Sequence, residues 1–408
     1  MQSFFRMFLL YQILANSIRV FINLWGLVSS KTRVYFKHRT LYKKEGYSLP
    51  TLWFHASSYG EFEGILPIIT EAKQEGSAFI LCSFFSSSGY IPLKDHPQVD
   101  QAVYAPFDTK KDVNHFLNEF RPAKLIISQN DFWPQMIQSC LDRQIPIYFV
   151  GTYLRTNHWW LKRSTLQLTA MLKEVSAIYV QDELSYDLLS TAGFKNIELT
   201  GNPRVDQVIK NAEDKKSYPI LEEFSKRKPL LVCGSTLAKD EAIILAAIDD
   251  TVQMNVLLVP HDPSSFNYGQ LSHFSWVRYS EIDTKRVPDT RIIVMDTLGD
   301  LKYVYGYGHM AYVGGGFDAG VHSVLEPAIF KIPLLSGPNT SKFRSAKDLK
   351  ELNCLTIINN KKELKLAMTA TLYRDNRDIS ADLTSYINSN KGASKQIYDS
   401  IRLSKDVS

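Results

Sequence analysis

Short runs of apolar, β-branched and aromatic residues alternate with longer stretches of helical spacing from residue 50 onward. The runs are apolar almost without interruption, which is typical of strands buried on both faces of a parallel sheet. A strand followed by a helix, many times over, predicts βαβ units. The predicted strands of the first half are 51–57, 78–84, 124–129, 146–151, 177–182 and 197–202, and those of the second half are 229–235, 255–260, 291–296, 310–316, 333–338 and 354–359.

A polar stretch, residues 207–228, separates the two series of strands and is interpreted as a linker. A chain of 408 residues is also too long for one ordinary core. The expected fold is therefore α/β, with two doubly wound domains that face each other across a cleft. The N-terminal domain is expected over residues 45–206 and the C-terminal domain over residues 229–400. Ligands of such sheets bind beyond the carboxyl ends of the strands, so residues that follow a strand carry the most weight.

Residues 3–28 are rich in apolar and aromatic side chains, but two arginines interrupt the run too soon for a clean membrane span. At helical spacing, the polar residues fall on one narrow stripe and apolar residues cover most of the remaining circumference. The stripe consists of Gln12, Asn16, Arg19 and Asn23. Such a helix, over residues 1–30, is expected to lie in a membrane interface. A helix docked on the protein's own core remains the alternative.

Basic residues come directly after this helix and form a collar: Lys31, Arg33, Lys37, His38, Arg39, Lys43 and Lys44. The collar favours anionic headgroups and, by the positive-inside tendency, keeps the rest of the chain cytoplasmic. No small-residue cleavage site comes after the helix, so a removed signal peptide is not expected. The whole chain is only mildly basic, with a net charge of +5 and no other block of Lys and Arg, so nucleic acid binding is not expected.

The four cysteines are far apart and mostly within apolar runs. They are Cys82, Cys140, Cys233 and Cys354. Without a CxxC pair or a paired His spacing, they are interpreted as buried thiols of a reducing compartment. Disulfides or a metal site are the alternative.

The first predicted strand ends in HASSYGEFEG, which places Gly60 and Glu61 at a strand-to-helix turn. A glycine lets the backbone approach a ligand, and a carboxylate at a helix start can reach the cleft. Transfer of a glycosyl group to a hydroxyl needs a base for the acceptor proton, and Glu61 is a candidate for that role. The same carboxylate can instead stabilise the start of the helix through the macrodipole.

The second domain begins with a strand followed by Ser235 and Thr236, hydroxyl residues that can donate to a phosphate or cap a helix. Later, three glycines in MAYVGGGFDAGVHSVLEP precede Ser323 and Glu326 at a helix start. Glu326 can accept from both ribose hydroxyls of a nucleotide, or complete a capping box. The glycine run lacks GxGxxG spacing, which disfavours an NAD domain. His322 has no second His at ligand spacing, which favours hydrogen bonding over metal binding.

Eight segments, in order along nearly the whole chain, resemble the Kdo transferase family, which transfers 3-deoxy-D-manno-octulosonic acid (Kdo). The segments are HASSYGE (55–61), YAPFD (104–108), ISQNDFWP (127–134), GNPRVD (201–206), GSTLAKDE (234–241), VPHDP (259–263), DTLGDL (296–301) and VGGGFDAGVHSVLEPA (313–328). The resemblance implies a GT-B fold of two Rossmann-like domains, with CMP-Kdo as donor and a lipid A precursor as acceptor in lipopolysaccharide biosynthesis. It implies inverting transfer with no metal and no other cofactor. It also implies a location on the cytoplasmic face of the inner membrane of a Gram-negative bacterium.

Carried over position by position, the resemblance assigns Glu61 as catalytic base and Arg204 as the cation that stabilises the transition state. Gln129 and Asp131 stand where the family usually has glutamates, and Arg204 stands where it usually has lysine. The candidate residues for binding CMP or substrate are Gly60, Ser235, Thr236, Pro260, His261, Leu298, Gly299, Asp300, Gly315, Ser323, Val324, Leu325 and Glu326. Departures at His261, Asp300 and Ser323 from the commonest family residues indicate a divergent branch.

Two other functions stay open on the sequence alone. One is a GT-B transferase that uses another nucleotide sugar, because the fold does not fix the donor. The other is a non-catalytic, membrane-bound protein that binds a nucleotide sugar, suggested by Gln129 and His261. The presence of Glu61 argues against the second.

Overall fold

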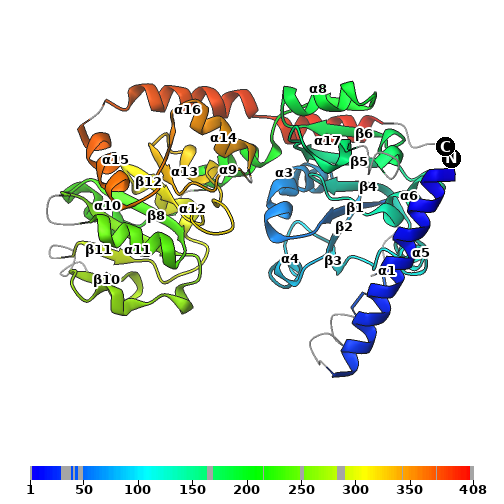
Figure 1. The fold of residues 1–408 in the computed structure, drawn as a ribbon, viewed down its shortest axis with the longest axis horizontal. Coiled ribbons are helices and arrows are strands. Elements are labelled where there is room, and N and C mark those ends of the chain that lie inside the picture. The colour runs from blue at the N-terminus through cyan, green and yellow to red at the C-terminus, as the bar shows by residue number, and fades with distance from the viewer. Residues whose placement is uncertain are drawn as a thin grey trace. The chain divides into compact units, whose positions relative to one another are not determined.

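The computed structural model describes residues 2–28, 38–39, 42–44, 49–162, 169–214, 216–248, 252–282, 290–341, 343–373 and 375–404. The chain divides into two compact units (Figure 1). Unit 1 comprises Met1–Gln207 and Asn390–Ser408, and unit 2 comprises Val208–Ser389. Three residues of the expected basic collar, Lys31, Arg33 and Lys37, lie outside the described residues.

Unit 1 is built on a parallel sheet in the order β3-β2-β1-β4-β5-β6-β7. The chain builds outward from β1 in one direction and then from β4 in the other, so the strand order reverses between β1 and β4. At such a switch point the loops after the two strands diverge and leave room for a ligand. The strands are β1 Thr51–Ala56, β2 Phe79–Phe84, β3 Gln101–Tyr104, β4 Pro122–Ser128, β5 Ile147–Thr152, β6 Ala177–Val180 and β7 Ile197–Leu199.

Helices cover both faces of this sheet, and a buried apolar cluster lies on each face, as the unbroken apolar strands predict (Figure 1). The helices of unit 1 are α1 Gln2–Val28, α3 Tyr59–Glu75, α4 Ser87–Leu93, α5 Lys110–Phe120, α6 Pro134–Asp142, α8 Glu183–Thr191 and α17 Ala393–Leu403. Ile397, Tyr398 and Ile401 of α17 belong to the same cluster as Phe54 and Ile126 of the sheet.

Unit 2 repeats this architecture with a parallel sheet in the order β10-β11-β9-β8-β12-β13-β14. Its strand order reverses between β8 and β12, so this pair forms a second switch point. The strands are β8 Leu230–Thr236, β9 Asn255–Pro260, β10 Trp276–Arg278, β11 Ile292–Val294, β12 Met310–Val313, β13 Leu334–Ser336 and β14 Leu355–Ile357.

The helices of unit 2 also lie over two apolar clusters, one on each face of the sheet. They are α10 Pro219–Arg227, α11 Ala238–Ala247, α12 Leu301–Val304, α13 Leu325–Ala328, α14 Arg344–Glu351, α15 Lys361–Tyr373 and most of α16 Arg377–Asn390. The chain passes from unit 1 to unit 2 within α9 Pro203–Glu213 and returns to unit 1 at the end of α16.

The two α/β units and all of the predicted strands are confirmed, but β3 and β10 were not predicted. The expected linker, residues 207–228, is not an extended connection. It contains the end of α9 and all of α10, and Leu221 and Phe224 are fully buried in the core of unit 2. The expected C-terminal domain, residues 229–400, differs from unit 2 at its end. Its last residues belong to α17, which packs on unit 1.

Helix α1 docks on unit 1 through one stripe and exposes the rest of its surface. The half-buried stripe consists of Phe8, Tyr11, Gln12, Ala15, Arg19 and Ile22. The exposed apolar side chains are Leu9, Leu10, Ile13, Leu14, Ile18, Val20, Phe21, Leu24 and Trp25. By length and composition, Met7–Trp25 is apolar enough to cross a membrane. Of the predicted polar stripe, Gln12 and Arg19 are half-buried against unit 1, and Asn16 and Asn23 are exposed.

Two residues of the expected collar are held by the protein itself. Arg39 is fully buried, and its guanidinium donates to the carbonyl oxygens of Ala105 (2.7 Å) and Phe85. Lys44 Nζ donates to Thr51 Oγ1 (3.0 Å). These two side chains stabilise the fold of unit 1 instead of facing a lipid surface.

Candidate active site

Glu61 lies in the first turn of α3, where the chain leaves β1 at the switch point of unit 1. Its Oε2 atom accepts from the Ser57 N–H (2.6 Å) and the Ser58 N–H (3.1 Å). These bonds make Glu61 the acidic partner of a capping box, which satisfies amides at the helix start. Its Oε1 atom makes no hydrogen bond with any residue that the structure describes, so one oxygen caps the helix while the other can receive a proton.

The pKa of Glu61 is raised from 4.5 to about 7. Burial in a low-dielectric environment is the main cause, and the charge of Asp131 adds to it. The His55 ring and the two amides lower the pKa and offset part of this rise. A carboxyl group with a pKa near neutral is a stronger base than an ordinary glutamate and is still about half ionised near pH 7, which suits general-base catalysis.

Asp131, after β4, lies beside Glu61 and is part of a chain of hydrogen bonds. Its Oδ2 atom accepts from Ser57 Oγ and lies 3.1 Å from Nε2 of the fully buried His55. His55 Nδ1 lies 2.8 Å from Ser83 Oγ, and Ser83 Oγ accepts from Trp53 Nε1 (2.7 Å). Because Ser83 accepts from Trp53, it can donate its own proton to His55 Nδ1, which leaves the proton of a neutral ring on Nε2 facing Asp131.

Burial raises the pKa of Asp131, but the His55 ring and the Ser57 hydroxyl outweigh burial and lower it overall. The pKa values of the two neighbouring carboxyl groups are thus driven apart. The lowered pKa of Asp131 favours its anionic form, and the raised pKa of Glu61 favours proton exchange near neutral pH. Two carboxylates separated in this way commonly take different roles in one reaction. No role was predicted for His55, although a histidine at the end of an apolar strand was a visible signal.

Gln129 begins the loop after β4 with a left-handed backbone (φ 55°). Its side-chain Nε2 lies 3.9 Å from the position of a Cβ atom on Gly64 in α3, so it packs against the helix that carries Glu61. Arg204 lies at the start of α9, and its N–H donates to Asn202 Oδ1 (3.0 Å). The neighbouring Pro203 packs on Gly151 at the carboxyl end of β5. No contact joins Arg204 to Glu61 among the described residues.

In unit 2, the loops after β8 and β12 touch through their backbones. A Cβ atom on Gly314 would lie 2.3 Å from the Ser235 carbonyl oxygen, so only glycine fits there. The buried Asp240 fixes both loops, because its carboxylate accepts from Gly315 N–H (2.8 Å) and Leu237 N–H (3.0 Å). Asp240 was missed in the sequence, where it looks like an ordinary first-turn acid. Close packing of the two loops at the switch point is therefore sufficient to explain why glycine is needed at Gly314.

Two histidines stack beside these loops. The rings of His261, after β9, and His322, after the glycine run, have centroids 4.8 Å apart and planes 16° apart. His261 N–H donates to the Thr236 carbonyl oxygen (3.0 Å), and His322 N–H donates to the Gly314 carbonyl oxygen (3.0 Å). Next to them, the buried Ser323 hydroxyl has no hydrogen-bond partner among the described residues. A buried polar group in this condition suggests a ligand or water that completes it.

Several candidates of unit 2 have side chains committed to the fold. Val324 and Leu325 are buried in or beside the core, so only their backbones can meet a ligand. Thr236 Oγ1 donates to the buried Glu241 (3.1 Å). The Asp300 carboxylate accepts from Tyr218 OH (2.5 Å) and from Lys216, and these bonds lower its pKa despite burial.

The remaining candidates offer accessible atoms. Leu298 is 78% exposed, and Gly299 has a left-handed backbone (φ 85°) in the loop before α12. Burial raises the pKa of Tyr305, and the charge of the nearby Glu326 raises it further. The Tyr305 hydroxyl lies where a Cβ atom of Gly234 would be, so Glu326 belongs to the β8 side of the switch point.

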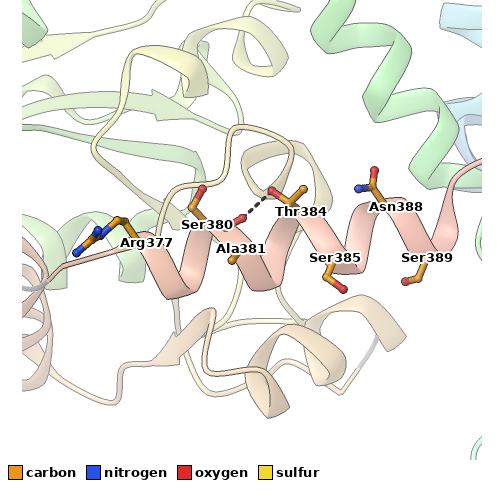
Figure 2. A pocket seen from close by; sticks show the side chains of 7 residues that line it. All are labelled: Arg377, Ser380, Ala381, Thr384, Ser385, Asn388 and Ser389. Atoms are coloured by element: carbon orange, nitrogen blue, oxygen red, sulfur yellow. Dashed lines mark hydrogen bonds between the residues drawn. The ribbon is translucent and has the colours of Figure 1, made fainter.

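A polar hollow along α16 contains none of these candidates (Figure 2). It is lined by Arg377, Ser380, Ala381, Thr384, Ser385, Asn388 and Ser389. Thr384 Oγ1 donates to the Ser380 carbonyl oxygen (2.7 Å), a bond within the helix. The face carries small hydroxyl and amide groups and no cluster of acids or bases, so we assign the active site to the switch points.

Comparison with known proteins agrees with this geometry. The family described as 3-Deoxy-D-manno-octulosonic-acid transferase (kdotransferase) matches residues 30–207. The 3-deoxy-D-manno-octulosonic acid transferase of Haemophilus influenzae is 27% identical over 311 residues, which cover 72% of this chain and 71% of the relative. That of Rickettsia prowazekii is 26% identical over 381 residues, which cover 88% of this chain and 81% of the relative.

Among solved structures, the UDP-GlcNAc 2-epimerase from Neisseria meningitidis bound to UDP-GlcNAc has a TM-score of 0.59 at 14% identity, over 86% of this chain and 99% of the epimerase. A putative UDP-N-acetylglucosamine 2-epimerase from Listeria monocytogenes has a TM-score of 0.58 at 13% identity, over 87% and 96%. These likenesses show the fold alone. Two parallel α/β units, each with its own switch point, define a GT-B-like fold. Within that class, residues 30–207 match the Kdo transferase family, and the two relatives that align over most of the chain are 3-deoxy-D-manno-octulosonic acid transferases.

Proposed function

We propose that this protein transfers Kdo from CMP-Kdo to a hydroxyl group of a lipid A precursor, with inversion at the anomeric carbon, in lipopolysaccharide biosynthesis. The match to the Kdo transferase family supports the sugar and the reaction class. The observation that carries the proposal for this chain is the state of Glu61. Its pKa of about 7 and its Oε1 atom, which bonds to no described residue, fit a base that receives the acceptor proton.

In the transfer step, Glu61 takes the proton of the acceptor hydroxyl while the acceptor oxygen forms a bond to the anomeric carbon of Kdo. The bond between that carbon and the CMP phosphate oxygen breaks, and its electron pair leaves with CMP. Attack on the face opposite the leaving group inverts the configuration. Asp131 raises the basicity of Glu61 through its negative charge. Arg204 is assigned to the negative charge that develops on the leaving phosphate.

We assign donor binding to the switch point of unit 2. The buried hydroxyl of Ser323 has no hydrogen-bond partner among the described residues. The stacked rings of His261 and His322 form a planar surface next to it. Pro260, Ser235, Gly315 and the backbones of Val324 and Leu325 complete the proposed surface for CMP, and Glu326 is assigned to the ribose hydroxyls. Leu298 and Gly299 are assigned to the edge of this surface. Asp300 and Thr236 act by shaping their loops, because their side chains are engaged within unit 2.

We assign the protein to the cytoplasmic face of the inner membrane, held there by α1. The support is the exposed apolar surface of α1, which includes Leu10, Phe21 and Trp25, on a helix that is docked by its opposite stripe. An acceptor embedded in the same membrane would then lie within reach of unit 1.

The deciding experiment incubates purified full-length protein with CMP-Kdo and a tetraacylated lipid A precursor and weighs the lipid product. A mass increase of one or more Kdo residues is expected, and its absence with an intact, CMP-binding protein would overturn the proposal. A parallel reaction in EDTA tests the expectation of metal-independent transfer. Thermal-shift titration with CMP, UDP and GDP discriminates the other donor classes, since stabilisation by UDP or GDP alone would favour a different nucleotide sugar.

A further inference from the structure

Asp108, the last residue of the YAPFD segment, is buried, and two helices share its carboxylate. Tyr11 OH of α1 donates to Oδ2 (2.6 Å). The Gln135 N–H and Met136 N–H of α6 donate to Oδ2 (2.9 Å) and Oδ1 (2.8 Å). The N-cap residue of α6, Trp133, supplies no capping bond from its side chain. Asp108 therefore caps α6 from a distant part of the chain, and its negative charge is favourable at a helix N-terminus.

The first turn of α6 continues directly from the loop that carries Asp131. The Trp133 ring closes this loop against Phe85 (centroids 4.7 Å apart) and edge-on to His55 (6.0 Å). The position of the first turn of α6 therefore sets where Asp131 meets His55 and Ser57. The charge of Asp131 raises the pKa of Glu61. A shift of α6 that moves Asp131 therefore changes the basicity of Glu61.

The same short segment holds α1 at a second point. Arg19 of α1 donates through Nη2 to Asp112 Oδ1 (3.0 Å) and through Nε to Asp112 Oδ2. Thr109 Oγ1 donates to the same carboxylate (2.7 Å). Residues 108–112 thus join α1 by two attachments that lie two helical turns apart, and they cap α6 as well.

We propose that Asp108 is a positioning residue that couples the seating of α1 on unit 1 to the placement of the loop Gln129–Trp133 in the active site. The inference rests on the proposed transferase function. With α1 seated, Tyr11 fills one acceptor site of Asp108 and the carboxylate keeps its buried orientation toward α6. Without that bond, only the two α6 amides orient the carboxylate, so the first turn of α6 and Asp131 are held less firmly. A helix that contacts the membrane would then also regulate the rate of transfer.

Tyr11→Phe tests the coupling because it removes only the hydroxyl. The matched control is Tyr179→Phe, which also removes a hydroxyl bonded in unit 1, to Ser400 Oγ (2.8 Å), at a site remote from α6. Both variants are assayed with a soluble, short-chain acceptor that needs no membrane attachment. We expect Tyr11→Phe to lower kcat about three- to tenfold with KM nearly unchanged, as misplacement of a catalytic loop does. The amides of residues 135–137 should exchange hydrogen faster, and the control should show neither effect.

Asp108→Asn is the stronger variant and should lower kcat further, but Tyr11→Phe decides the question if Asp108→Asn does not fold. Unchanged kcat and unchanged amide exchange in Tyr11→Phe would overturn the coupling. An equal loss in Tyr179→Phe, or a loss only on membrane-embedded acceptor, would also overturn it, because α1 would then be an anchor alone. Failure of the proposed function looks different, since the wild-type protein would then make no Kdo-lipid product while the amide exchange still tests the coupling.

Discussion

At the residue scale, Glu61 combines two tasks that the sequence presented as alternatives. Its Oε2 atom caps α3 through two backbone amides, and its Oε1 atom makes no bond to a described residue. Capping holds the carboxylate in one orientation, which a base needs, so the structural task supports the proposed chemical one.

Replacement of Glu61 separates these tasks. Glu61→Gln keeps a side-chain oxygen that can accept from the Ser57 and Ser58 amides, but it cannot take a proton at neutral pH. We expect it to abolish transfer with CMP affinity unchanged within a few-fold. Glu61→Ala should abolish transfer and also lower the free energy of unfolding by about 1 kcal/mol, the usual cost of a lost cap. Product mass and urea unfolding measure both effects, and normal turnover by Glu61→Gln would contradict the assignment.

The pH dependence of transfer depends on the pKa of Glu61. The base works only when ionised, so kcat/KM should rise with pH, reach half of its maximum near the Glu61 pKa of about 7, and level off about one pH unit higher. Asp131→Asn removes a negative charge that raises this pKa, while His55, which lowers it, remains. The inflection should therefore move to lower pH, whatever the loss of rate. A profile measured from pH 5 to 9 checks the direction, and an inflection that stays in place or moves to higher pH would argue against the pairing of these carboxyl groups.

Glu61 was a candidate from the sequence because it comes after an apolar strand, whereas Gln129 and Asp131 were candidates through the family resemblance. The sequence could not show that Asp300 is engaged within unit 2, because its partners Lys216 and Tyr218 are distant along the chain. It also missed His55 and Asp108, whose roles depend on contacts across the sheet. The spacing of residues along a chain shows which of them share a helix or strand face. It does not show contacts between residues of different elements.

At the element scale, most of the strands were predicted because burial on both faces produces an apolar run, although β7 was predicted without such burial. The two missed strands, β3 and β10, are at the outer edges of their sheets and are short. Edge strands have one neighbour and carry polar residues, as in Gln101 and Arg278, so their composition resembles that of a loop. The docking stripe of α1 could not be predicted from the pattern of polar and apolar residues either, since it contains both kinds, as in Phe8, Tyr11 and Arg19.

Helix α1 gives an element-scale prediction. Replacing Leu10, Leu14 and Phe21 together with Gln removes exposed apolar surface and leaves the docking stripe intact. A fully buried side chain of this size contributes about 1.5–3 kcal/mol, so we expect binding to anionic liposomes to fall about tenfold or more. Activity on a soluble acceptor should persist. The control replaces the exposed polar residues Asn16 and Asn23 with Gln. Equal sedimentation of both variants with liposomes would show that this face does not bind lipid.

At the scale of the whole molecule, each unit has its own cores, but unit 1 is built from two separate parts of the chain. Helix α17 adds Ile397 to the cluster that contains Cys82, whereas Leu383 of α16 packs in the cluster that contains Cys354. All four cysteines are buried free thiols, as the sequence predicts, and therefore report the opening of each unit.

Ile397→Ala should destabilise unit 1 by about 2–5 kcal/mol and speed the alkylation of Cys82 in mild urea, with little effect on Cys354. Leu383→Ala is the matched change in unit 2 and should have the opposite pattern. Mass mapping of the alkylated peptides measures both. If Ile397→Ala exposes Cys354 as readily as Cys82, the two units unfold as one and their stabilities are not separate.

The return of the chain to unit 1 also sets an order of events during synthesis on the ribosome. Domains commonly fold one after another as they emerge, the first to be made being the first to finish. Here unit 2, a single stretch from Val208 to Ser389, can complete its fold while unit 1 still waits for α17. During that interval the nascent chain exposes the apolar surface that Ile397, Tyr398 and Ile401 later cover. The growing chain thus needs protection at unit 1 until the end of translation, and a transcript truncated before α17 yields a substrate for chaperones and proteases.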